Sequence, residues 1–122
     1  MPIRWTISHP ERLVVATTDG DVTLKDIEAY LDAVVVGEAT SYAKLFDATA
    51  LQPVASDEEV MLLGARMRAY MATWPGGPVA FVATTPPARE FIARFLNLSG
   101  GTRPANVFTS IAEARRWLDG QR

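Results

Sequence analysis

The chain has 122 residues, a formal net charge of −2 and no cysteine. This length is typical of one domain, which we expect to span residues 1–122. The near-balanced charge excludes the basic surface typical of nucleic-acid binding, and the lack of cysteine excludes disulfides, a thiol nucleophile and thiolate metal ligands. The sequence contains neither the apolar run of a signal peptide nor the roughly eighteen apolar residues of a membrane-spanning helix. We therefore expect a cytoplasmic protein without stable membrane association.

The first predicted elements form a β-hairpin. Residues 3–8 alternate apolar and polar side chains, the period of a half-buried strand, and this alternation turns Trp5 inward. Residues 9–12 include a proline and predict a turn. The β-branched residues of segment 13–18 predict a second, antiparallel strand, and segment 19–21 should break it.

A helix is predicted between Thr23 and Gly37. Thr23 is the expected N-cap, and Asp26 falls at the third helical position, near the positive end of the helix dipole. Gly37 is the expected stop. The predicted apolar face consists of Leu24, Ile27, Leu31 and Val34.

The segment 44–53 follows as a short buried strand that ends in Asp47 and Thr49 and then becomes a loop. In an α/β sheet this transition lies at the carboxyl end of a strand, where ligands usually bind. Ser56 and Glu59 then form a capping box that starts a long helix. Its predicted inward stripe consists of Val60, Leu63, Met67, Met71 and Trp74.

The run 79–83 is continuously apolar, as is typical of a central strand covered on both faces. Thr85 is the expected N-cap of a third helix, with Pro86 at its first position. A short strand over 106–109 is followed by Ser110, which again starts a Ser-x-x-Glu capping box. The final helix should turn Ile111, Ala114, Trp117 and Leu118 inward.

The predicted order is therefore β-β-α-β-α-β-α-β-α. Because strands and helices alternate from the second strand onward, we predict an α/β fold with a mixed, mostly parallel sheet of about five strands and four helices.

This order, with Lys44-Leu45-Phe46-Asp47-Ala48-Thr49 on the third strand and the tail 107–118, resembles the STAS domain of anti-sigma-factor antagonists. It is most similar to the small bacterial stand-alone proteins grouped with SpoIIAA-like or Sec14-like domains. The resemblance covers nearly the whole chain as a pattern of elements. It implies a non-enzymatic regulatory or binding module that acts through protein contacts or a small ligand.

In antagonist-type members, a serine in an Asp-Ser-Ser-Gly run at the end of the third strand is phosphorylated by a partner kinase. The resemblance places Thr49 at that position and Asp47 beside it. Ala48 departs from the pattern, and no glycine follows Thr49. The Sec14-like resemblance implies an alternative, a carrier of a small apolar or lipid ligand, which requires a cavity. Its expected lining includes Phe46, Met67, Met71, Phe81 and Phe95.

The residues themselves leave two interpretations of the strand ends open. Asp47, Thr49, Thr84 and Thr85 can line one crevice that suits a small anion or a partner protein. Alternatively, Asp47 hydrogen-bonds loop N–H groups as an Asx turn, the Thr49 hydroxyl satisfies the backbone, and Thr85 merely caps a helix. In either case we expect Asp47, Thr49 and Thr84 to lie near one another at one edge of the sheet.

Other polar residues have simple structural explanations. The acidic run 57–59 suits the first turn of a helix, and no second group of metal ligands accompanies it. His9 precedes a proline in a turn, without a serine or carboxylate at a recognisable spacing for a catalytic triad. We expect no enzyme activity, metal or cofactor. Homodimerisation is compatible with so small a domain, but no sequence feature identifies an interface.

Overall fold

The structure is a computed structural model that describes residues 2–54, 56–74, 76–99 and 103–121. Its strands are β1 (Ile3–Ser8), β2 (Leu13–Thr18), β3 (Gly20–Val22), β4 (Ala43–Asp47), β5 (Leu51–Pro53), β6 (Val79–Val82) and β7 (Ala105–Phe108). Its helices are α1 (Leu24–Val36), α2 (Asp57–Thr73), α3 (Pro86–Ser99) and α4 (Ile111–Gly120).

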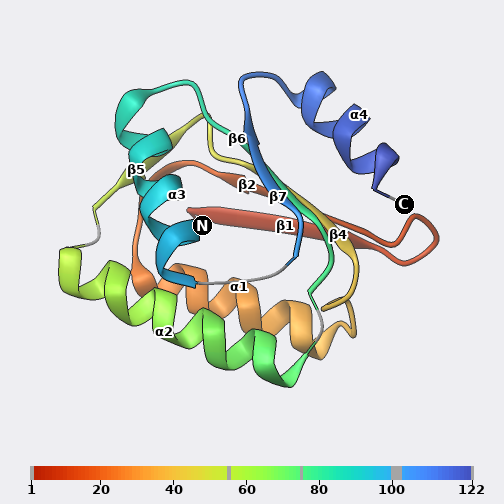
Figure 1. The fold of residues 1–122 in the computed structure, drawn as a ribbon, viewed down its shortest axis with the longest axis horizontal. Coiled ribbons are helices and arrows are strands. Elements are labelled where there is room, and N and C mark those ends of the chain that lie inside the picture. The colour runs from red at the N-terminus through yellow and green to blue at the C-terminus, as the bar shows by residue number, and fades with distance from the viewer. Residues whose placement is uncertain (1, 55, 75, 100–102, 122) are drawn as a thin grey trace.

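The main sheet of the described chain has five strands in the order β1-β2-β4-β6-β7 (Figure 1). β1 and β2 pair antiparallel, as the hairpin pattern predicts. β2 with β4, β4 with β6, and β6 with β7 all pair parallel. The predicted mixed, mostly parallel α/β fold is confirmed, and β4 lies at the centre of the sheet.

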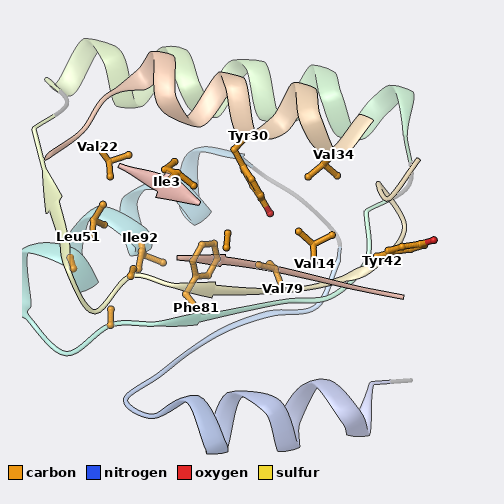
Figure 2. Close-up of a cluster of buried hydrophobic side chains, with 14 of the residues drawn as sticks. Ile3, Val14, Val22, Tyr30, Val34, Tyr42, Leu51, Val79, Phe81 and Ile92 are labelled. Atoms are coloured by element: carbon orange, nitrogen blue, oxygen red, sulfur yellow. The ribbon is translucent and has the colours of Figure 1, made fainter. Parts of the chain in front are cut away.

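Helices cover both faces of this sheet. α1, α2 and α3 lie on one face and α4 lies alone on the other (Figures 1 and 2). The larger hydrophobic core lies between the sheet and the helices α1–α3 and includes Val14, Val34, Val79 and Phe81 (Figure 2). The smaller core lies between the sheet and α4. The continuously apolar β6 is buried at every position, because it contributes side chains to both cores.

Two short strands were not predicted. The segment 19–21 was expected to break the second strand and the residues after Thr49 to form a loop, but Gly20–Val22 and Leu51–Pro53 pair in parallel as β3 and β5. Each has three residues, too few for an alternating pattern to be recognised. Gly20 has φ of +76°, a conformation that glycine adopts readily, and its N–H donates to the carbonyl of Ala50.

The predicted helix starts are confirmed. Thr23 and Ser56 form complete capping boxes with Asp26 and Glu59, respectively. Thr85 accepts a hydrogen bond from the Ala88 N–H at the start of α3. Ser110 accepts from the Glu113 N–H, but the return bond of a capping box is not formed between these two described residues.

Two side chains predicted to face inward do not. Trp74 is 37% exposed, because α2 ends at Thr73 and Trp74 follows as an extended C-cap residue outside the helical stripe. Ile111 is 41% exposed in the first turn of α4, and burial of this short helix begins one turn later, at Ala114.

Close packing of α2 against α3 depends on Gly64. A Cβ atom at this position would lie 2.7 Å from the Leu98 Cβ atom and 3.2 Å from the Leu98 carbonyl carbon, so α3 would have to shift. We predict that Gly64→Ala lowers the free energy of unfolding by roughly 1 kcal/mol, because a gain of about 1 kcal/mol in helix propensity offsets only part of a typical overpacking cost of about 2 kcal/mol.

Urea unfolding followed by circular dichroism measures this change. Gly120→Ala is the matched control, because a Cβ atom there meets no atom within 4 Å. A Gly64→Ala variant as stable as the wild type would contradict the assigned packing of α2 on α3.

Candidate functional site

The carboxyl edge of the sheet brings the predicted site residues to one side of the molecule. Asp47 ends β4 and pairs in register with Val82 at the end of β6, and the Ala48 N–H donates to the Val82 carbonyl over 2.8 Å. Thr84 follows Val82 by two residues. The two strand ends therefore share one edge, as the sequence suggests.

Asp47 and Thr49 form a closed local turn at this edge. The Oδ1 atom of Asp47 accepts hydrogen bonds from the backbone N–H of Thr49 at 3.0 Å and from its hydroxyl at 2.7 Å. The bond from the Thr49 N–H is the Asx turn of the second interpretation, whereas the Thr49 hydroxyl bonds to the Asp47 carboxylate and not to the backbone. Thr84 and Thr85 are exposed, and among the described residues no hydrogen bond joins either of them to Asp47 or Thr49.

Thr49 is also remote from a helix N-terminus. The strand β5 and the residues up to the Ser56 cap separate it from the start of α2. The backbone N–H groups that often receive a phosphate at a helix start are therefore not adjacent to the Thr49 hydroxyl.

The acidic residues that begin α2 have structural roles. Glu59 accepts a hydrogen bond from the Ser56 N–H, and Asp57 forms an exposed ion pair with Arg94 at 2.8 Å. Within the described ranges, no group of three or more His, Asp or Glu side chains is arranged to hold a metal ion. His9 lies in its predicted turn but also bonds to the Tyr42 hydroxyl at 2.7 Å.

A second candidate site is a cavity between the main sheet and α1, α2 and α3. The sequence predicted an apolar cavity but did not indicate any polar group in it. Its volume is about 70 Å³. Four of the five residues expected to line a carrier cavity do line it, namely Phe46, Met67, Phe81 and Phe95, whereas Met71 does not. The other apolar lining residues include Ile27, Leu31, Leu51, Leu63, Val79, Phe91 and Ile92.

Four polar side chains line the same cavity: Lys44 from β4, Tyr30 from α1, Tyr70 from α2 and Arg103 from the segment before β7. Figure 2 shows Tyr30 extending from α1 with its hydroxyl directed towards the sheet. The buried Tyr70 hydroxyl has no hydrogen-bond partner among the described residues. An otherwise apolar cavity thus contains two basic groups and two phenols.

Lys44 is placed in the cavity by the pleat of β4. Its neighbours Ala43 and Leu45 belong to the core under α4, so Lys44 and Phe46 project to the opposite, cavity-bearing face. Lys44 is only 5% exposed. Its ammonium donates to the carbonyl oxygens of Thr40 at 2.7 Å and Tyr42 at 2.8 Å. The sequence feature that could have indicated this site is a lysine within a strand that is covered on both faces.

Burial changes the acid–base behaviour of all four groups. It lowers the pKa of Lys44 to about 7, with a smaller contribution from the positive charge of Arg103. Burial also lowers the pKa of Arg103, although guanidinium remains charged at neutral pH. It raises the pKa of both Tyr30 and Tyr70, so these phenols remain protonated hydrogen-bond donors.

Comparison with solved structures identifies the fold. The chain is similar to a DUF3478-family protein with a SpoIIAA-like fold from Shewanella loihica PV-4, with a TM-score of 0.62, 18% identity, and 95% and 93% of the two chains covered. It is also similar to the anti-sigma factor antagonist SpoIIAA in its unphosphorylated form, with a TM-score of 0.59, 17% identity and coverage of 97% and 98%.

An anti-sigma factor antagonist from Mycobacterium paratuberculosis aligns with a TM-score of 0.60, 18% identity and coverage of 96% and 94%. The protein therefore has the SpoIIAA-like fold of STAS domains, as the order of its elements suggests. No protein-family model and no curated protein matches the sequence. None of the helices described is long and apolar enough to cross a membrane.

The lowered pKa of Lys44 predicts a pH-dependent stability. Between about pH 7 and pH 10.5 the unfolded chain holds a proton on this lysine that the folded chain has released, so the free energy of unfolding rises with pH. Lys44→Met should remove this rise. One pKa unit corresponds to about 1.4 kcal/mol. Between pH 7 and pH 9.5, the free energy of unfolding of the wild type should therefore increase by up to about 3 kcal/mol relative to that of the variant.

Urea unfolding of both proteins at several pH values tests this prediction. The upper limit of pH 9.5 avoids ionisation of Tyr30 and Tyr70, the other titratable groups of the cavity besides Arg103. The test compares how the free energy of unfolding changes with pH in the two proteins. Loss of the hydrogen bonds to Thr40 and Tyr42 lowers the stability of the variant by an amount that depends little on pH, so it does not alter this comparison. Parallel curves would show that Lys44 is protonated throughout this range.

Proposed function

We propose that this protein is a non-enzymatic binding module of STAS type that holds a small, largely apolar ligand in the cavity between the main sheet and α1–α3. The observation that supports this proposal is the cavity itself, which contains apolar side chains from β4 and β6 as well as from all three helices. Ligand sites in proteins are commonly concave, mostly apolar and supplied with a few convergent polar groups.

The volume of the cavity limits the ligand. At about 70 Å³ it exceeds the roughly 10–15 Å³ that one water requires, but it is well below the roughly 300–1,000 Å³ of pockets for drug-sized ligands. A whole lipid does not fit this volume. Among the carrier functions suggested by the Sec14-like resemblance, the cavity favours a compound with one ring or a short chain.

Binding of a small aromatic probe tests the proposal. We predict that benzyl alcohol, titrated into ¹⁵N-labelled protein, shifts the backbone amide signals of cavity residues such as Phe46, Phe81 and Ile92. Ile27→Phe should weaken this binding, because the larger ring at a lining position occupies part of the volume. Leu62→Phe is the control, since Leu62 is exposed on α2.

Shifts confined to surface residues, or equal responses of the two variants, would contradict binding in the cavity. The amide spectrum also reports whether each variant is folded, so lost binding can be separated from lost structure.

The strand-end residues support a second, regulatory candidate. Thr49 presents an exposed side chain at the end of β4, the position of the phosphorylated serine in the family that the sequence resembles. Asp47 accepts the Thr49 hydroxyl proton in a hydrogen bond, so a phosphate there would lie beside a carboxylate and break the Asx turn. Such a modification would act by opening this loop rather than by docking on a helix N-terminus.

Incubation with serine/threonine kinases, followed by mass-spectrometric mapping, tests the regulatory candidate. The expected product is a phosphate on Thr49 that is absent from Thr49→Val. Phosphorylation restricted to other exposed hydroxyls, for example Thr84 or Thr85, would exclude Thr49 as the acceptor.

A further inference from the structure

We propose that the cavity binds a small amphipathic carboxylic acid, with the carboxylate on Lys44 and Arg103 and the apolar part against the aromatic side chains. This inference rests on the proposed ligand-binding function and specifies the chemical class of the ligand. It derives from the charges and hydrogen-bonding groups at the polar end of the cavity.

Neither Lys44 nor Arg103 forms an ion pair within the described chain. The only ion pairs among the described residues are Arg66–Glu28 and Arg94–Asp57, and neither involves Lys44 or Arg103. Both side chains line the same cavity, and their mutual repulsion contributes to the lowered pKa of Lys44. Lys44 is buried and Arg103 is partly exposed. A buried cation in a protein is normally paired, so this end of the cavity favours an anion.

Hydrogen-bond donors remain available there as well. Two of the three ammonium N–H groups of Lys44 are bonded to the carbonyls of Thr40 and Tyr42, which leaves one. The Arg103 side chain lines the cavity and is partly exposed, and the buried Tyr70 hydroxyl has no hydrogen-bond partner among the described residues. One ammonium N–H, a guanidinium fork and a phenol are the donors that a carboxylate accepts well.

The rest of the cavity selects against a fully hydrated anion. Phe46 and Phe81 pack with ring centroids 5.6 Å apart, and Tyr30 packs edge-on against Phe46 at 5.7 Å. Both phenylalanines line the cavity together with Phe91. An inorganic anion would leave these surfaces uncovered, whereas an acid with a ring or a short chain would cover them and still reach the cationic end.

A matched pair of ligands tests this inference. Benzoate and benzyl alcohol have the same ring, and only benzoate carries a carboxylate, which is ionised at pH 6. We expect benzoate to bind the wild-type protein at least roughly tenfold more tightly in an amide-shift titration, because hydrogen bonds to charged groups are among the stronger ones. Inorganic phosphate should bind more weakly than benzoate.

Arg103→Gln should remove the preference for benzoate while benzyl alcohol still binds. Arg115→Gln, on the exposed side of α4, is the charge-matched control and should behave as the wild type. Tyr70→Phe deletes only a hydroxyl that has no partner among the described residues, so this variant should fold normally and bind benzoate a few-fold more weakly.

The possible outcomes separate the two proposals. Equal affinity of wild type for the acid and the alcohol would overturn the carboxylate assignment and leave the binding module intact. Binding of neither probe would overturn both. A preference for benzoate that persists unchanged in Arg103→Gln and Tyr70→Phe would place the anion elsewhere and also overturn the assignment.

Discussion

The central position of β4, which is covered on both faces, determines the rest of the structure. β4 pairs with β2 on one side and β6 on the other, and successive side chains pack alternately against α4 and against the α1–α3 layer. A shift of one residue in its register would move Lys44 into the smaller core and Leu45 into the cavity. The same register brings Asp47 to the carboxyl edge beside the end of β6. Both candidate sites are therefore positioned by one strand.

The cavity chemistry opposes stability. Lys44 is held by two backbone carbonyls, but neither it nor Arg103 forms an ion pair within the described chain, and desolvation of a cation is unfavourable. A methionine at position 44 would fill similar space without this penalty. Buried groups that lower stability and have strongly shifted pKa values are typical of functional sites. The polar end of the cavity fits this description better than any other group of described side chains.

The fold could be predicted from the sequence because most of its helices and strands are marked by residues close together in the chain, such as helix caps and alternating apolar side chains. The caps at Thr23 and Ser56 and the alternation of β1 were identified correctly for this reason. The pairing of β3 with β5 was missed because it depends on contact between segments far apart in the chain. The cavity was predicted only as an apolar space. Its polar end combines Lys44 and Arg103 with tyrosines from two helices, and only tertiary packing brings these groups together.

The two sites differ in how far their polar groups are already satisfied. At the sheet edge, the Asp47 carboxylate holds both the amide and the hydroxyl of Thr49, so a ligand there must first replace bonds that the protein makes with itself. In the cavity, the buried Tyr70 hydroxyl has no described partner, and Lys44 and Arg103 form no ion pair within the described chain. A ligand that accepts from the Tyr70 hydroxyl gains a hydrogen bond without breaking a described protein bond, and it relieves the cost of leaving that buried group unpaired. The free energy available for binding is therefore larger inside the fold than at its edge, although sequence motifs direct attention to the edge.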